Sequence, residues 1–200
     1  MNKTTRPLDD DEVLKIITII KNGYVSIDKN KKKVTRRGND RIAFALYLET
    51  VLGLRISDIL KLKLSNFQKR GTEWYIVIKE KKTKKQRNFI VPGDVYNSIL
   101  NYCLTHSIND RDEMIFKFGA RAVQKSIENA CEYLELVDVS SHSFRKTFAT
   151  KAFYNSNNNL LLTQHLLQHF SPATTQRYIN INSQEMKNVL NSIAFDIKFE

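Results

Sequence analysis

Residues that mark several large classes of protein are scarce in this chain of 200 residues. Its two cysteines, Cys103 and Cys131, are far apart and do not form a C-x-x-C pair. A disulfide framework and a thiolate metal site are therefore not expected, and we predict two ordinary buried thiols. The chain has no apolar run of about 18 residues, the length of a membrane-spanning helix, and no signal-type N-terminus. We expect a cytoplasmic, nucleoid-associated protein with no membrane partner.

Acidic residues are also in the minority. The chain has 21 Asp and Glu against 32 Lys and Arg, which leaves a formal net charge of +11. A charge of this size predicts a polyanionic partner, because each phosphate neutralised by a cationic side chain releases condensed counterions. Double-stranded DNA is the first candidate, and an anionic membrane surface is the rival.

Two basic runs concentrate the positive charge. Segments 29–41 (KNKKKVTRRGNDR) and 79–87 (KEKKTKKQR) together hold 13 of the 32 Lys and Arg residues. Such concentration favours a DNA-binding face, although a solvated loop is the alternative for either run alone. The predicted DNA-binding residues are Lys31, Lys32, Lys33, Arg36, Arg37, Lys81, Lys84, Lys85 and Arg87.

Helical spacing of apolar residues dominates the sequence. Asp9 and Glu12 resemble a capping pair at the start of a helix that Gly23 would end. Strand-like segments at 73–79 and 87–91 predict a hairpin with residues 81–86 near its tip. Further helices are predicted at about 39–52, 56–60, 95–106, 120–136, 144–154, 160–168, 174–181 and 184–197. The expected fold class is mainly α with a small antiparallel β-sheet (α+β), formed as a single domain by residues 1–200.

Three segments carry functional groups in a fixed order. They are GLRISDILKL at 53–62, HSFRKTFAT at 142–150 and LLQHFSPATTQRYI at 166–179. In these segments the chain resembles the catalytic domain of the tyrosine recombinases of the phage integrase family. The resemblance covers about residues 9–182. It implies the catalytic residues Arg55, Lys82, His142, Arg145, His169 and Tyr178, with Asp58 as a supporting residue.

The residue types suit cleavage of a phosphodiester without a metal or other cofactor. Two guanidinium groups can hold the non-bridging oxygens, where charge gathers during attack, and Arg55 and Arg145 suit that role. A lysine with a lowered pKa can protonate the leaving 5′-oxygen; Lys82 is the preferred choice, although three neighbouring lysines lie within a few residues. By resemblance, the phenol of Tyr178 attacks and forms a 3′-phosphotyrosine.

The histidines allow two interpretations. By resemblance, His142 accepts the phenolic proton or orients a phosphate oxygen, and His169 donates to the same oxygens. His165 and His169 also stand at i and i+4, a spacing that can chelate zinc. The metal interpretation is the weaker one, because Leu166 replaces the glutamate of H-E-x-x-H and no further carboxylate ligand is evident nearby.

The resemblance implies a site-specific recombinase that integrates, excises or inverts DNA, as a homotetramer on paired sites and a monomer when free. Relaxation of DNA in the manner of type IB topoisomerases and a non-catalytic DNA-binding regulator are the alternatives. Only 54 residues precede Arg55, so we expect no N-terminal core-binding domain, as in fimbrial-type invertases or a piece of a longer integrase. The amphipathic segment 184–197 is expected to dock on a neighbouring protomer, with docking on its own core as the alternative.

Overall fold

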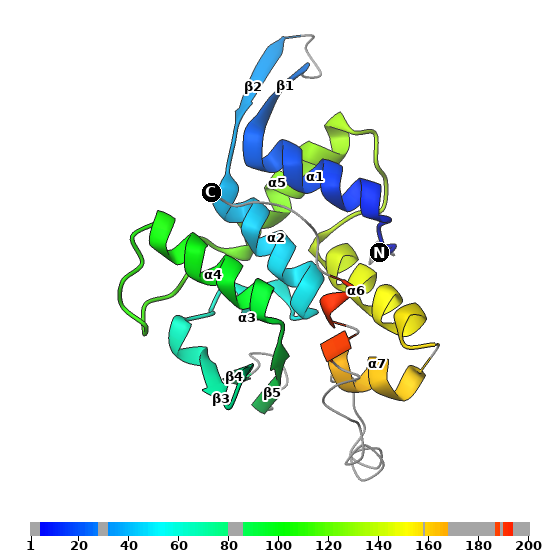
Figure 1. Cartoon of the computed structure of the whole chain (residues 1–200). Helices are drawn as coiled ribbons and strands as arrows, with labels where there is room; N and C mark the ends of the chain where they lie inside the picture. The colour runs from blue at the N-terminus through cyan, green and yellow to red at the C-terminus, as the bar shows by residue number, and fades with distance from the viewer. Residues whose placement is uncertain are drawn as a thin grey trace.

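The computed structural model describes residues 5–27, 32–79, 86–157, 159–167, 187–188 and 190–193. Helices pack around α2, and two small antiparallel sheets lie at opposite ends of the molecule (Figure 1). The helices are α1 (Asp10–Asn22), α2 (Asp40–Leu52), α3 (Ile56–Ile59), η1 (Leu64–Asn66, a 3-10 turn), α4 (Gly93–Thr105), α5 (Ala120–Tyr133), α6 (Ser141–Asn155) and α7 (Leu160–Leu167). The strands are β1 (Gly23–Ile27), β2 (Lys33–Arg37), β3 (Phe67–Arg70), β4 (Glu73–Lys79) and β5 (Gln86–Val91). The predicted mainly α class with antiparallel β-structure is confirmed.

Helix α1 begins at the predicted capping pair. The Asp9 carboxylate accepts from the Glu12 amide at 2.8 Å, and the Glu12 carboxylate accepts from the Asp9 amide at 3.1 Å. The two bonds satisfy amide groups that have no partner inside the helix. Gly23 ends the helix with a φ of 80°, as the sequence predicts. The buried face consists of Val13, Ile16, Ile17 and Ile20.

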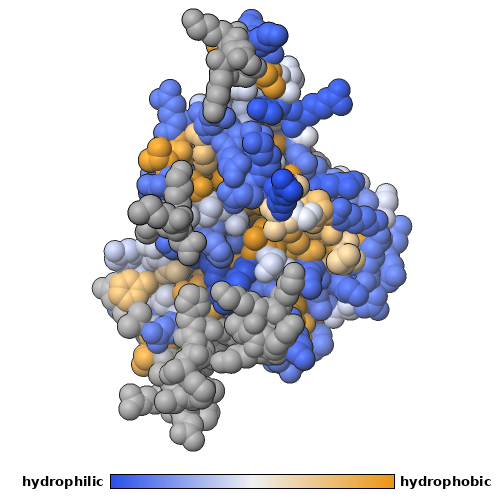
Figure 2. All heavy atoms as spheres, turned by 180° about the vertical axis from the view of Figure 1, so that it is seen from behind, coloured by the Kyte–Doolittle hydropathy of each residue, from blue (hydrophilic) through white to orange (hydrophobic). Residues whose placement is uncertain are grey.

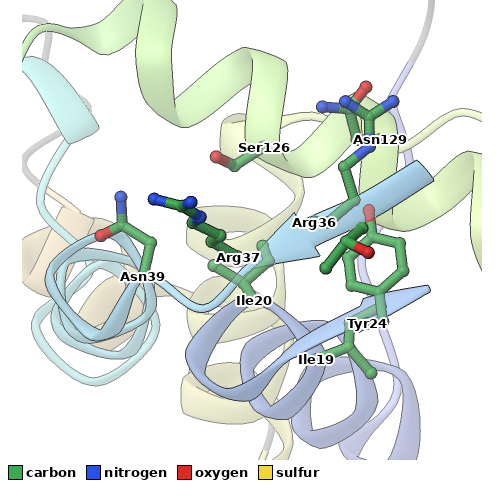
Figure 3. Close-up of a pocket in the computed structure, with 9 residues that line it drawn as sticks. Ile19, Ile20, Tyr24, Arg36, Arg37, Asn39, Ser126 and Asn129 are labelled. Atoms are coloured by element: carbon green, nitrogen blue, oxygen red, sulfur yellow. The ribbon is translucent and has the colours of Figure 1, made fainter. Parts of the chain in front are cut away.

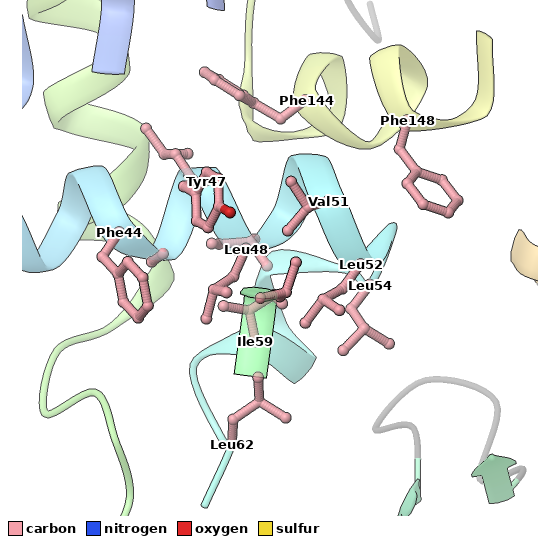
Figure 4. Packing of buried hydrophobic residues seen from close by; sticks show 14 of the residues in the cluster. Phe44, Tyr47, Leu48, Val51, Leu52, Leu54, Ile59, Leu62, Phe144 and Phe148 are labelled. Atoms are coloured by element: carbon pink, nitrogen blue, oxygen red, sulfur yellow. The ribbon is translucent and has the colours of Figure 1, made fainter. Parts of the chain in front are cut away.

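Helix α2 is the centre of the core. Every residue from Ile42 to Leu52 is buried, so this helix is covered on all sides. Figure 4 shows Phe44, Leu48 and Val51 of α2 among the apolar side chains that surround it, with Phe144 of α6 on one side. No helix within the described residues is long and apolar enough to cross a membrane.

The turn between α2 and α3 depends on Gly53. This residue has a φ of 58°, in the left-handed region that favours glycine. A Cβ atom placed here would lie 2.3 Å from the ring of Phe148, so α6 leaves no room for a side chain. Arg55 follows two residues later as the N-cap of α3. The backbone at Gly53, two residues before a predicted catalytic residue, therefore lies directly against α6.

The sheet of β3, β4 and β5 contains the predicted hairpin. Strands β4 and β5 pair antiparallel, with Trp74 opposite Val91 and Ile78 opposite Arg87. Strand β3 adds a third strand that the sequence did not predict, because FQKR contains no β-branched residue. The segment of the hairpin tip, 81–85, lies outside the described residues.

A second hairpin, β1–β2, was also missed by the sequence analysis. It pairs Gly23 with Arg37 and Ile27 with Lys33, and we call it the basic hairpin (Gly23–Arg37). Its root packs on α5 through Tyr24 and Tyr133, whose ring centroids are 4.6 Å apart. The hairpin then extends away from the helices, at the top of Figure 1. The density of charge in the first basic run concealed the alternating strand pattern.

The described part of the C-terminal segment packs on its own chain. Leu190 and Ile193 are fully buried in the core. Lys187 forms an ion pair with Glu73 of β4 at 2.7 Å, and Ser192 accepts a hydrogen bond from Asn155 of α6 at 2.7 Å. Leu190 and Ile193 therefore favour docking on the segment's own core, whereas its other apolar residues, Met186, Val189 and Ile197, lie outside the described residues. Docking on a neighbouring protomer stays a prediction.

Candidate catalytic site

Arg145 joins three segments that are distant in sequence. Its Nη1 donates to the carbonyl of Gly53 at 2.6 Å, and its Nη2 donates to the carbonyl of Leu167 at 2.8 Å. The side chain is only 6% exposed. Arg145 therefore fixes α6 against the α2–α3 turn and the end of α7. Both acceptors are neutral carbonyls, so they orient the guanidinium without cancelling its charge.

Arg55 lies at the same turn. Its backbone is extended, with φ −71° and ψ 145°, and its carbonyl accepts from the amides of Asp58 at 2.8 Å and Ile59 at 3.0 Å. The Arg55 side chain is partly exposed, whereas Asp58 is 4% exposed. The structure thus brings the two predicted phosphate-binding arginines to one turn, with the supporting aspartate buried behind it.

His142 stands at the first turn of α6, three residues before Arg145. Ser140 caps this helix, and its hydroxyl accepts from the His142 amide at 3.2 Å. The His142 side chain is exposed and lines a cavity of about 630 Å³ together with Ser140, Ser141 and Asp138. Residues at i and i+3 share a helix face, so His142 and Arg145 belong to the same side of α6.

Arg87 does not lie where the sequence analysis placed it. It was predicted to contact DNA, but it is only 1% exposed. Its Nη1 reaches the Gly53 carbonyl at 3.5 Å, its Nη2 donates to the Leu166 carbonyl, and its Cζ lies 4.7 Å from the centre of the Phe89 ring. The prediction of DNA contact is corrected, because a side chain this buried has no surface to offer to a phosphate.

The sequence did contain a signal for the burial of Arg87. Side chains alternate between the two faces of a strand. In β5, Arg87 therefore shares a face with Phe89 and Val91, which are buried. The lysines before Arg87 made it look like the end of a solvated charge run instead.

Arg87 and Arg145 together form what we call the arginine clamp. It consists of these two guanidinium groups and the carbonyls of Gly53, Leu166 and Leu167. The Gly53 carbonyl accepts from both arginines, and the two leucine carbonyls belong to the last turn of α7. Carbonyls at the end of a helix lack partners inside the helix and carry its partial negative charge. They are suitable acceptors for buried cations.

Glu49 of α2 is a further residue that the sequence analysis missed. It is 0% exposed, and its Oε1 accepts from the amide of Ile56, the first residue of α3, at 3.0 Å. Burial raises the pKa of Glu49 well above its ordinary range, although the Ile56 amide and the charge of Arg145 act to lower it. It lay inside an apolar helical run, which gave no sign of a role at the site.

The exposed cations of the first basic run belong to the basic hairpin. Lys32 and Lys33 are exposed at its outer end. At its root, Figure 3 shows Arg36 and Arg37 beside a pocket of about 270 Å³. The pocket is lined by Ile19, Ile20, Tyr24, Thr35, Arg36, Arg37, Asn39, Ser126 and Asn129. The lining is rich in hydrogen-bond donors and contains no carboxylate, a composition that suits a phosphate.

Several predicted site residues lie outside the described residues. They are Lys31, Lys81, Lys82, Lys84, Lys85, His169 and Tyr178. The backbone of His165 belongs to α7, but its side chain is not described. Within the described part of the chain, no group of three or more His, Cys, Asp or Glu could hold a metal ion. Of the predicted set, the structure brings Arg55, Asp58 and Arg145 to the α2–α3 turn. His142 lies three residues before Arg145 on α6, at a pocket that these three residues do not line.

Comparison with known proteins agrees with this geometry. The family model described as "Phage integrase family" matches residues 6–185, most of the chain. The chain belongs to the phage integrase family. The resemblance noted from the sequence motifs is thereby confirmed, and the protein has the fold and the enzyme class of the tyrosine recombinases.

The relatives of this phage integrase family member are integrases and recombinases. The chain is 30% identical over 152 residues to the probable integrase/recombinase YoeC of Bacillus subtilis, covering 72% of this chain and 80% of YoeC. It is 25% identical over 195 residues to the tyrosine recombinase XerA of Pyrococcus furiosus, covering 92% of this chain and 60% of XerA. The chain thus spans only part of the length of XerA.

Solved structures share the fold at low sequence identity. The XerH site-specific recombinase bound to difH substrate superposes with a TM-score of 0.61 at 20% identity, over 92% of this chain and 52% of XerH. The lambda integrase catalytic core gives a TM-score of 0.59 at 17% identity, over 82% of this chain and 95% of that core. The superposition on an isolated catalytic core is consistent with a catalytic-domain fold for the described residues.

Proposed function

We propose that this protein is a site-specific recombinase that cleaves double-stranded DNA with Tyr178 and rejoins it through a 3′-phosphotyrosine. The observation that carries the proposal is the anchoring of Arg145 at the turn that presents Arg55. Two fixed cations at one turn can hold both non-bridging oxygens of a phosphodiester and stabilise the charge that develops during attack. Asp58, buried next to Arg55, supports this turn from the inside.

The other predicted residues complete the chemistry. His142 accepts the phenolic proton or orients a phosphate oxygen, and its exposed position at the start of α6 suits contact with a large substrate. Lys82 protonates the leaving 5′-oxygen, and His169 donates to the phosphate. The covalent link to Tyr178 conserves the energy of the phosphodiester, so rejoining needs neither ATP nor a cofactor.

The test is covalent trapping on a nicked suicide substrate. The wild-type protein should form an adduct that resists denaturation, and Tyr178→Phe should form none while binding DNA normally, because the change removes one oxygen and no charge. An adduct formed by Tyr178→Phe would contradict the assignment and direct attention to Tyr154, which is 66% exposed. Full activity in EDTA is expected; loss of activity that zinc restores would favour the His165 and His169 metal site instead.

DNA contact is assigned to the basic hairpin and to the lysines around the predicted tip of the β4–β5 hairpin. Lys32, Lys33, Arg36 and Arg37 offer cations along β2 and at the pocket of its root. Hydrophilic residues alternate with smaller apolar patches on the described part of the face seen in Figure 2, and a polar surface suits contact with nucleic acid. Lys31, Lys81, Lys84 and Lys85 are assigned to the same role.

The assembly that acts on DNA is proposed to be a homotetramer on two recombination sites, formed from free monomers in the cytoplasm. XerH, a relative by fold, is a site-specific recombinase whose structure holds its difH substrate. Exchange between two labelled sites supports recombination, whereas adduct formation with relaxation of a plasmid lacking a second site would favour a topoisomerase-like activity. The resemblance to fimbrial-type invertases stays a prediction. Inversion of a DNA segment between two inverted sites would test it.

A further inference from the structure

Burying Arg87 costs free energy, so its position needs an explanation. A cation removed from water loses strong solvation unless other groups replace it. The groups described around Arg87 include the carbonyls of Gly53 and Leu166 and the face of the Phe89 ring. An apolar side chain of similar size would fill the same space at less cost, but it could not link β5 to both carbonyls.

The partners of Arg87 are next to the partners of Arg145. Both guanidinium groups donate through Nη1 to the Gly53 carbonyl, and through Nη2 to adjacent carbonyls of α7, Leu166 for one and Leu167 for the other. The two forks therefore hold the same two backbone segments. Because Gly53 stands two residues before Arg55, any shift of this turn changes the distance between Arg55 and Arg145.

Glu49 also holds this turn, through two backbone amides. Its Oε1 accepts from the Ile56 amide at 3.0 Å, and its backbone carbonyl accepts from the Gly53 amide at 3.1 Å. Its Oε2 is buried and has no hydrogen-bond partner among the described residues. Burial raises the pKa of this carboxyl well above its ordinary range.

We propose that Arg87 and Glu49 are positioning residues of the recombinase site, which fix the turn carrying Arg55 relative to Arg145 without touching DNA. Arg87 acts through the Gly53 and Leu166 carbonyls, and Glu49 acts through the Ile56 amide. The inference rests on the proposed function, because positioning has a consequence only where Arg55 and Arg145 hold a phosphate.

The experiment measures single-turnover cleavage of the suicide substrate and, separately, the dissociation constant for DNA. Arg87→Met keeps the length of the side chain and removes the fork. We expect cleavage at saturating DNA to fall by roughly tenfold to a hundredfold, as a misplacement of about 1 Å can do, with unchanged DNA affinity. Lys69→Met is the matched control, since Lys69 is exposed on β3, and it should cleave at the wild-type rate.

Arg87→Lys keeps the result interpretable if Arg87→Met does not fold. A lysine retains the charge, but one ammonium group cannot reproduce the planar fork that spans two carbonyls. Measured well below its unfolding temperature, this variant should bind DNA normally and cleave slowly. Wild-type cleavage by a folded Arg87→Lys variant would overturn the proposal, because it would show that Arg87 contributes stability alone.

Two variants, Glu49→Gln and Glu49→Leu, separate the role of the hydrogen-bond acceptor for the Ile56 amide from that of a carboxylate charge. Gln keeps an oxygen for the Ile56 amide and stays neutral, so cleavage within about twofold of wild type is expected, whereas Leu should lower cleavage like Arg87→Met. An equal loss in both variants would show that an ionised carboxylate is required and would overturn the role of Glu49. Failure of the wild-type protein to form any adduct would instead contradict the proposed function itself.

Discussion

The arginine clamp and the basic hairpin use the same kind of side chain in opposite environments. Arg87 and Arg145 are 1% and 6% exposed and are oriented by neutral carbonyls. Lys33 and Arg37 are exposed on a two-stranded sheet that extends from the helices. Exposed charges are screened over about 8 Å at physiological salt, whereas buried ones are screened much less.

The difference shows that the net charge of +11 is not a single property of the surface. We expect the cations of the basic hairpin to act at a distance, because exposed positive charges attract a phosphate backbone whatever its sequence. Cations of the clamp act over the length of a hydrogen bond and determine geometry. Each region therefore predicts a different dependence on salt and a different step at which a mutation acts.

The largest effect is expected from substitution of Arg145, the clamp residue that is proposed to contact the phosphate. Arg145→Ala removes the proposed phosphate contact and both carbonyl bonds. The activation free energy of cleavage should therefore rise by about 3–4 kcal/mol or more. Arg55→Ala should lower cleavage similarly but destabilise the fold less, because Arg55 is partly exposed. Single-turnover cleavage and thermal unfolding measure the two quantities. Cleavage by Arg145→Ala within tenfold of the wild-type rate would contradict the assignment.

Changes in the C-terminal segment test whether the buried core is formed by one chain alone. Leu190→Ala should lower the free energy of unfolding by roughly 2–5 kcal/mol, because Leu190 is fully buried. Deletion of residues 184–200 should give an insoluble or unfolded protein, as judged by circular dichroism. Asn191→Ala, at an exposed neighbouring position, is the control and should be neutral. A folded, DNA-binding monomer after the deletion would instead favour docking on a neighbouring protomer.

A smaller and different effect is expected from the basic hairpin. Arg36→Ala combined with Arg37→Ala should weaken DNA binding and reduce the slope of log affinity against log salt by about two. Cleavage at saturating DNA should stay at the wild-type rate, since the hairpin does not contribute to the clamp. Fluorescence anisotropy across a salt series measures the slope. An unchanged slope would remove the hairpin from the DNA interface; Lys125→Ala, on exposed α5, is the control.

The smallest effect concerns a surface ion pair that belongs to neither region. The hydrogen bond from Arg6 lowers the pKa of Glu12 in the folded state. The pair therefore stabilises the protein above the ordinary glutamate pKa, and this contribution is lost as pH falls through the lowered folded value. Glu12→Gln should cost roughly 0.2–1 kcal/mol at pH 7, in urea unfolding, and nothing in strong acid. A cost that persists in strong acid would assign the effect to helix capping instead.

Periodicity and local chemistry were enough to predict most of the fold. The capping pair at Asp9, the glycine at the end of α2 and the alternation in β4 and β5 each have a local cause, so the sequence alone indicates them. The basic hairpin was missed because most residues of β2 are cationic or polar and two of the hairpin's apolar residues, Val25 and Ile27, are exposed. Such a strand buries no face and leaves no clear pattern.

The site was predictable only in part, for a different reason. Motif spacing indicated Arg55, His142 and Arg145, but it could not indicate which neutral groups hold them. Arg87 contacts residues 34 and 79 positions away, and Arg145 contacts a carbonyl 92 positions away. Contacts of this kind depend on tertiary packing, as does the choice of subunit on which Leu190 is buried. A sequence pattern gives the apolar face of a helix but does not identify the groove that receives it.

The shared carbonyl of Gly53 also has a consequence for biosynthesis. This one oxygen belongs to the first third of the chain, yet it meets Arg87 from β5 and Arg145 from α6, and both arginines continue to the last turn of α7. During translation, the clamp therefore cannot close until residue 167 has left the ribosome. A nascent chain that ends before this residue can form its early helices, but it lacks an ordered arginine pair. The arginine pair thus becomes ordered only after the last turn of α7 has been synthesised.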